Sequence, residues 1–123
     1  MMRLSKIEID VCDICGEMHG RMRGLVRGTV CDRCYRLLND RDALYVCVSE
    51  RVEKTYNRLK LFEELGLDAA EIETYLTKVE ALLKEEDSPF ETVRAQIIGN
   101  FEVISALETT LILANIDDVT NKM

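Results

Sequence analysis

The chain has 123 residues, with 16 basic and 23 acidic side chains and a formal net charge of −7 at neutral pH. Hydrophobic residues make up 47% of the sequence, which is enough to build a core and excludes an intrinsically disordered chain. A single proline and the absence of tryptophan disfavour a β-sandwich, and five cysteines are too few for a disulfide scaffold. We therefore expect a mainly α protein.

The composition changes along the chain. Residues 1–36 contain two close pairs of cysteines, the single histidine and a small basic excess, with seven basic and five acidic side chains. Residues 37–123 contain nine basic and eighteen acidic side chains. This contrast predicts a zinc finger in residues 1–36, followed by a helical bundle and oligomerisation region in residues 37–123.

The N-terminal residues show no apolar run of the kind found in secretory signals. The sequence also lacks an uninterrupted stretch of about 18 apolar residues, the length at which a transmembrane helix becomes a candidate. We expect a cytoplasmic protein with no membrane partner. In that reducing compartment, paired cysteines persist as metal ligands more readily than as disulfides.

The two cysteine pairs are the strongest chemical signal. Cys12 and Cys15 are separated by two residues, fifteen residues follow, and Cys31 and Cys34 repeat the spacing. Two such pairs are typical of zinc sites, because each forms a tight knuckle and four thiolates complete a tetrahedron. The pattern predicts one structural Zn²⁺ per chain, and Gly16 suits the positive φ that such a knuckle needs.

Three alternatives at this site are less favoured. A redox-active dithiol would be expected as a lone Cys-x-x-Cys pair on a thioredoxin-like unit. His19 could replace one cysteine ligand, but a polar loop residue is the simpler interpretation. Cys47 lies in an apolar stretch and is expected to pack as a small hydrophobic residue.

Between the pairs, residues 19–30 predict a β-hairpin or knuckle loop rich in arginine. In an extended strand Arg21, Arg23 and Arg27 share one face, and Arg33 and Arg36 follow at the start of the next helix. These five arginines form a local basic patch and are the candidate partner-binding residues. The patch is either a solvated hairpin surface, a phosphate contact or a docking site for an acidic protein.

The rest of the chain predicts a three-helix antiparallel bundle. A first helix is expected from Asp32 to Leu65, with Gly66 as its C-terminal stop. A break at Asn39-Asp40 and a short strand at residues 45–48 are alternatives. Asp68 is expected to cap the second helix, and Ser88-Pro89 to begin the third, which ends before a frayed tail of residues 116–123. The apolar stripes exceed what one short second helix can cover, which predicts a homodimer.

The segments Cys12-Asp13-Ile14-Cys15-Gly16 and Val30-Cys31-Asp32-Arg33-Cys34 resemble two known families. One is the N-terminal zinc-binding domain of the Clp protease unfoldase, a dimeric treble clef that binds adaptors and substrates. The spacing is more similar to that of the small zinc-binding anti-sigma factors of spore-forming bacteria. Both resemblances cover residues 12–36 alone, and they imply a treble-clef or ribbon finger that binds proteins rather than catalyses a reaction.

The sequence shows no phosphate-binding glycine loop and no nucleophile–base pair, so an enzyme is not expected. The favoured hypothesis is a regulatory or adaptor protein that binds another protein, such as an inhibitor of a transcription or defence component. The alternative is a DNA-binding transcriptional regulator that uses the arginine-rich hairpin. A weaker hypothesis is that the acidic loop around Glu85–Asp87 enters a basic cleft by charge mimicry.

Overall fold

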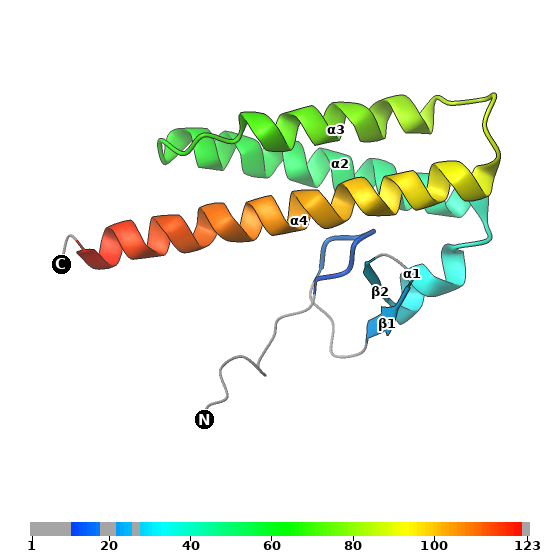
Figure 1. Cartoon of the computed structure of the whole chain (residues 1–123), viewed down its shortest axis with the longest axis horizontal. Coiled ribbons are helices and arrows are strands. Elements are labelled where there is room, and N and C mark those ends of the chain that lie inside the picture. Colours follow the sequence, from blue (N-terminus) through cyan, green and yellow to red (C-terminus); the bar gives the residue numbers. More distant parts are fainter. Residues whose placement is uncertain (1–10, 18–21, 26–27, 122–123) are drawn as a thin grey trace.

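A computed structural model of the chain describes residues 11–17, 22–25 and 28–121, with side chains described up to residue 115. The sequence predictions for His19, Arg21 and Arg27 lie outside the described residues. The described chain is mainly helical, as the composition predicts, and it also contains a two-stranded antiparallel sheet (Figure 1).

The hairpin expected between the cysteine pairs is formed by β1 (Met22–Gly24) and β2 (Thr29–Cys31). Met22 lies opposite Cys31, and Gly24 lies opposite Thr29. The N–H of Leu25 donates to the carbonyl of Gly28 at 2.9 Å, and Gly28 has a φ of 81°. Glycine adopts this left-handed conformation without steric cost, so the chain can return and carry the second cysteine pair into a helix.

The helix expected from residue 32 is divided into two helices at Asn39-Asp40, the alternative break that the sequence predicts. A short helix α1 (Asp32–Leu37) ends before Asn39, and α2 (Arg41–Glu64) starts after Asp40, whose carboxylate accepts a hydrogen bond from the N–H of Ala43 at 3.2 Å. An N-cap of this kind satisfies a backbone donor that the first helical turn leaves unpaired. The alternative strand at residues 45–48 is wrong, because these residues lie inside α2.

Helix α2 ends in a Schellman motif at Gly66, which was the expected stop. Gly66 has a φ of 77°, its N–H donates to the carbonyl of Glu63 at 3.0 Å, and the N–H of Leu67 donates to the carbonyl of Phe62 at 2.8 Å. Helix α3 (Ala70–Leu83) follows, and the carboxylate of Asp68 accepts from the N–H of Ala70 at 3.0 Å, as the capping prediction requires.

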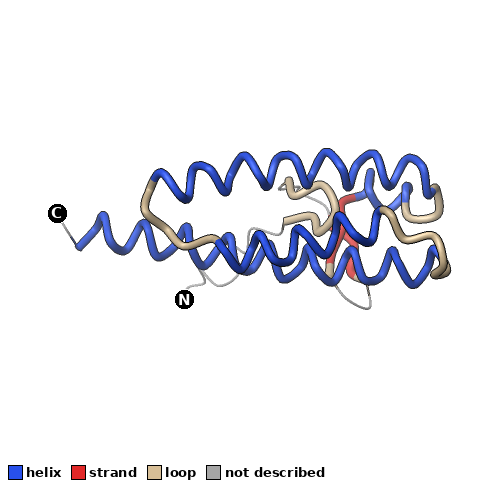
Figure 2. The backbone as a smooth tube through the Cα atoms, turned by 90° about the horizontal axis from the view of Figure 1, so that it is seen from above, coloured by secondary structure: helices blue, strands red, loops and turns tan. Residues whose placement is uncertain are grey.

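Helix α4 (Phe90–Asn121) begins directly after Ser88-Pro89, as predicted, but it continues through residues that were expected to fray. The tail prediction for 116–121 is wrong. Neither glycine nor proline follows Ala114, and each further residue of an existing helix adds one hydrogen bond for the two dihedral angles it fixes. The end of α4 therefore projects beyond the other helices (Figures 1 and 2).

Helices α2, α3 and α4 lie along one another, and each reverses the direction of the one before (Figures 1 and 2). The hairpin and α1 lie at the end of the molecule where α2 and α4 begin (Figure 1). The fully buried apolar side chains of the three long helices come from every one of them: Leu44, Val48, Ile72, Leu76, Val79, Val93, Ile97, Phe101 and Ile104. These side chains form one continuous core with the cysteine region.

Within the described residues, one segment, Phe90–Asn115, is long and apolar enough to cross a membrane by length and composition. A core helix of a soluble protein meets the same criterion, and Val93, Ile97 and Phe101 are buried within this protein. The cytoplasmic location therefore stays a prediction from the sequence.

Candidate metal centre

The two cysteine pairs meet in one cluster. Cys12 and Cys15 lie in the loop before β1, Cys31 is the last residue of β2, and Cys34 lies in α1. The four Sγ atoms all lie within 4.8 Å of one another. None of the four residues is more than 5% exposed, so the cluster is closed to solvent.

Backbone amides surround the sulfur atoms. The N–H groups of Ile14 and Cys15 donate to Cys12 Sγ at 3.4 Å, and the N–H of Cys34 donates to Cys31 Sγ at 3.5 Å. Cys31 is also the N-cap of α1, which places its sulfur at the positive end of the helix. These donors stabilise negative charge on sulfur and favour thiolates.

Hydrogen bonds between the thiols shift the pKa values of three of the cysteines. The thiols of Cys15 and Cys34 donate hydrogen bonds to Cys12 and hold the pKa of Cys12 far below its ordinary value. The same hydrogen bonds raise the pKa of Cys15 to about 11 and raise the pKa of Cys34 as well. Four thiolates this close repel one another, so a cation is needed for all four to ionise.

The cluster fits a tetrahedral metal ion. With metal–sulfur bonds of about 2.3 Å, the sulfur atoms of a tetrahedral site are about 3.8 Å apart, which is compatible with Sγ atoms that all lie within 4.8 Å of one another. The four cysteines can therefore hold a metal ion, as their spacing predicts. A set of four sulfur ligands is typical of zinc or iron, and it fills the coordination sphere with protein atoms.

Sequence reasoning missed Arg51, which lies against the cluster from α2. Its side chain is 0% exposed, and its Nη1 donates to the carbonyl of Cys12 at 3.5 Å. Its Nη2 donates to Ser105 Oγ at 3.2 Å, and its Cζ lies 4.5 Å from the centre of the Phe101 ring. Arg51 therefore joins the cysteine knuckle to both α2 and α4.

A buried carboxylate accompanies Arg51. Glu108 Oε1 lies 3.7 Å from Arg51 Nη2, and Glu108 Oε2 accepts from Arg58 Nη1 at 3.1 Å. Burial lowers the pKa of Arg51, and the charge of Glu108 opposes that shift. One signal in the sequence could have found Arg51, since Arg51 and Thr55 follow Val48 at helical spacing on the buried stripe of α2.

Gly16 explains how the guanidinium fits under the knuckle. Its φ of 76° matches the positive value expected after Cys15. A Cβ atom at this position would lie only 2.6 Å from Nε of Arg51, which has no hydrogen-bond partner among the described residues. Gly16 is therefore required both by its backbone conformation and by the close approach of Arg51.

Asp13 attaches the first knuckle to the hairpin. Its carboxylate accepts from the N–H of Thr29 at 2.8 Å, and its own N–H donates to the Thr29 carbonyl at 2.8 Å. Burial raises the pKa of Asp13, and the Thr29 N–H opposes that shift. A Cβ atom at Gly28 would lie 2.5 Å from the Asp13 carboxylate and 3.2 Å from Ile98, so the turn, the knuckle and α4 meet closely.

Three of the five predicted partner-binding arginines lie in the described residues, and all three are exposed. Arg23 donates to Asp32 Oδ1 at 2.7 Å, and its Cζ lies 4.6 Å from the centre of the Tyr35 ring. Arg33 and Arg36 lie on α1, and the pKa of Arg33 is raised by the nearby Cys47 and Cys34. The cluster thus carries arginines on its outer side.

Cys47 does not join the metal cluster. It lies on α2, partly buried against the core, as the prediction of a small hydrophobic residue requires. Arg33 Nη2 lies 3.9 Å from its Sγ.

The four-cysteine cluster is consistent with a finger-like metal-binding segment, but its spacing recurs in unrelated proteins. Comparison with known proteins finds no matching family model, no matching curated protein and no matching solved structure.

Proposed function

We propose that this chain is a non-catalytic, zinc-binding regulatory or adaptor protein that acts by binding another protein. The observation that carries the proposal is the closed cluster: four cysteines, each at most 5% exposed, occupy the coordination positions and leave none for a substrate. In this proposal the metal is one structural Zn²⁺ per chain. The knuckle, hairpin and helix order supports a finger of the treble-clef type.

The contact surface in this proposal is the exposed arginine face, defined here as Arg23, Arg33 and Arg36. Arginine suits binding of acidic surfaces because its planar guanidinium can form two parallel hydrogen bonds with a carboxylate. Arg23 is oriented by Asp32 and by the Tyr35 ring, which lowers the entropy lost on binding. The partner in this proposal is an acidic protein, such as a component of transcription or defence.

The test is affinity capture with a charge-matched control. The triple variant Arg23→Glu, Arg33→Glu, Arg36→Glu is compared with a control in which the exposed lysines 60, 78 and 84 become glutamate. Both variants change the net charge by the same amount. We expect a defined partner to be retained by the zinc-loaded wild type and by the control and lost by the arginine variant. Equal capture by both variants would contradict the proposal.

A DNA-binding regulator is the second candidate, because the same exposed arginines could contact phosphates. The salt dependence of binding distinguishes this candidate from the protein-binding function. Binding to duplex DNA that weakens steeply with salt, with a slope reduced by Arg23→Ala, would favour DNA over protein.

We also propose that two copies associate through the end of the molecule where α2 stops and α4 projects (Figure 1). Leu61, Leu65, Ile112 and Leu113 are between 48% and 57% exposed there. Large exposed apolar side chains mark association surfaces when they gather at one place. We expect sedimentation equilibrium to give a dimer, and Ile112→Asp with Leu113→Asp to give a monomer. Val46→Asp is the control on another part of α2, and an unchanged mass in the double variant would contradict this interface.

A further inference from the structure

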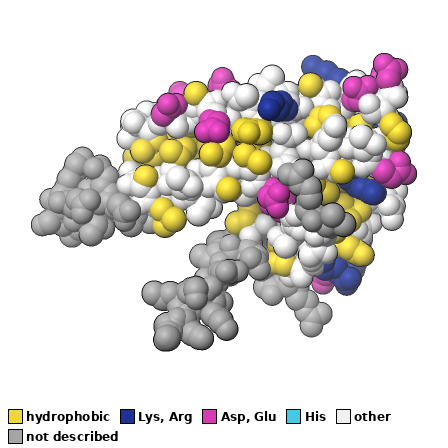
Figure 3. Space-filling view, viewed as in Figure 1, with side chains coloured by type: hydrophobic (Ala, Val, Ile, Leu, Met, Phe, Trp, Pro, Cys, Tyr) yellow, Lys and Arg dark blue, Asp and Glu magenta, His cyan; other side chains and the backbone are white. Residues whose placement is uncertain are grey.

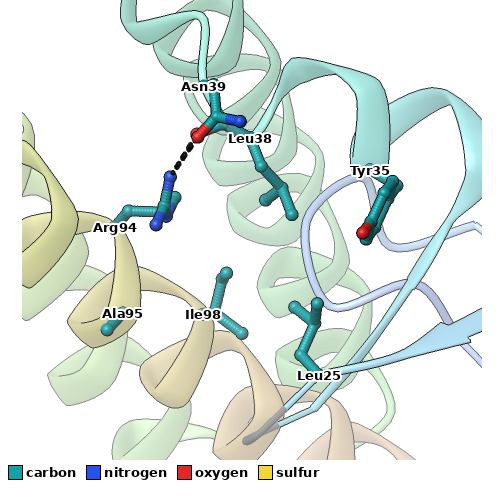
Figure 4. Close-up of a pocket in the computed structure, with 7 residues that line it drawn as sticks. All are labelled: Leu25, Tyr35, Leu38, Asn39, Arg94, Ala95 and Ile98. Carbon is teal, nitrogen blue, oxygen red and sulfur yellow. Dashed lines mark hydrogen bonds between the residues drawn. The ribbon is translucent and has the colours of Figure 1, made fainter.

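A groove lies between the hairpin, the α1–α2 joint and the first turns of α4. Its volume is about 420 Å³, and seven residues line it: Leu25, Tyr35, Leu38, Asn39, Arg94, Ala95 and Ile98. Figure 4 shows these side chains arranged around an open centre, with the guanidinium of Arg94 at one edge. Four of them are bulky apolar or aromatic groups, which makes the floor of the groove apolar.

The groove is held open by contacts in its walls. Nη1 of Arg94 donates to the carbonyl of Leu38 at 2.6 Å and to Oδ1 of Asn39 at 3.0 Å, so α4 is fixed to the joint between α1 and α2 (Figure 4). On the other side, the tight approach of Gly28 to Ile98 fixes the hairpin against α4. A site formed before the ligand arrives loses less entropy on binding.

Three arginines lie in or beside the groove, and acidic side chains also lie at this end of the molecule (Figure 3). Arg94 lines the groove, Arg23 lies over the Tyr35 ring, and Arg36 is exposed on the same helix as Tyr35. Asp32, the acidic residue of α1, pairs with Arg23 at 2.7 Å. Tyr35 itself is 41% exposed, so an apolar ring and several guanidinium groups are presented together.

We propose that this groove binds an acidic protein segment through one bulky apolar side chain. The apolar side chain enters between Leu25, Leu38 and Ile98, and flanking carboxylates pair with Arg94 and with the arginine face. This inference rests on the proposed protein-binding function and adds to it a pocket and a ligand chemistry. Buried apolar contact supplies affinity at such sites, while the surrounding charges select the partner.

The test uses a random dodecapeptide phage library and Ala95, which is exposed and lines the groove. Peptides are selected on the zinc-loaded protein, and the enriched sequences are synthesised and measured by fluorescence anisotropy. Ala95→Glu places a repelling carboxylate in the groove, and Ala95→Phe fills it. Ala106→Glu and Ala106→Phe are the matched controls, since Ala106 is exposed on the same helix about three turns away.

We expect the selected peptides to combine aspartate or glutamate with leucine, methionine or phenylalanine. Both Ala95 variants should weaken their binding about tenfold or more, and both Ala106 variants should leave it unchanged. Circular dichroism of each variant checks that the fold is kept.

Three outcomes would overturn the inference. Selected peptides without acidic residues, or no enriched peptide at all, would remove the proposed ligand chemistry. Equal affinity of the wild type and both Ala95 variants would place binding outside the groove. If the Ala95 variants bind the peptide as the wild type does but the arginine triple variant loses it, the proposed protein-binding function stands and the groove is not the binding site. If the arginine triple variant also binds the peptide normally, both the proposed function and the groove inference are wrong.

Discussion

Replacement of Gly16 by alanine tests whether the cysteine knuckle and the helices form one packed unit. Gly16 has a φ of 76°, and its missing Cβ leaves room for Nε and Cδ of Arg51, which would otherwise lie at 2.6 and 2.7 Å. Gly66 is a matched control because its φ of 77° is nearly the same and nothing lies within 4 Å of a Cβ added there.

The two substitutions share one energetic cost and differ in a second. A left-handed conformation costs an alanine about 1–2 kcal/mol, which applies to both positions. At Gly16 the added methyl group also overpacks a buried side chain, which typically costs about 1–3 kcal/mol. We therefore expect Gly66→Ala to lower the free energy of unfolding by about 1–2 kcal/mol and Gly16→Ala by about 2–5 kcal/mol.

The assay is urea denaturation followed by helical circular dichroism, at a fixed and saturating concentration of free zinc. A double-mutant cycle with Arg51→Ala isolates the contact, because Gly16→Ala should then cost no more than Gly66→Ala. Equal losses for the two single glycine variants, or a cycle with no coupling between positions 16 and 51, would refute the packing of Arg51 beneath the knuckle.

Three further predictions concern the cluster and the helices. Native mass spectrometry should find one zinc per chain, lost on chelation or in Cys34→Ser and kept in Cys47→Ser; an equally folded metal-free protein would contradict this. Arg51→Met should lower the free energy of unfolding in urea by about 1–3 kcal/mol, because it removes the buried hydrogen bonds to Cys12 and Ser105. The loss is limited because Glu108 keeps its contact with Arg58 at 3.1 Å. The hydroxyl of Tyr56 donates to Glu80 at 2.6 Å, and this hydrogen bond raises the pKa of Tyr56. The hydrogen bond therefore stabilises the folded state fully below the unfolded pKa of about 10, and this stabilisation is lost as pH rises through the folded pKa. Denaturation of Tyr56→Phe and wild type should therefore differ at neutral pH and converge in strong alkali.

The parts of this protein that the sequence predicts are those governed by local rules. The cysteine spacing predicts a cluster because a tetrahedral site constrains its ligands wherever they lie in the chain. The break at Asp40, the stop at Gly66 and the start after Ser88-Pro89 depend on capping groups within a few residues.

The parts that the sequence does not predict depend on contacts between distant residues. Arginine is a residue type usually found on the surface, and Arg51 is buried because it contacts Cys12, Phe101 and Ser105, which lie 39 to 54 residues away in the sequence. The groove is similar, since the position of Arg94 is set by Leu38 and Asn39, more than fifty residues earlier. Helical periodicity shows that such a position lies on the buried face of a helix, but it does not identify the residues that its charged group contacts.

Arg51 also changes the interpretation of the charge contrast between the two parts of the chain. With the proposed Zn²⁺ bound, four thiolates would leave the cluster with a net charge of −2, which a nearby cation stabilises. Arg51, from the acidic part of the chain, donates to the Cys12 carbonyl at 3.5 Å, so its positive charge lies beside the cluster. The exposed Arg23 and Arg36 lie on the outer surface of the finger, so their positive charge can serve a partner rather than the metal centre.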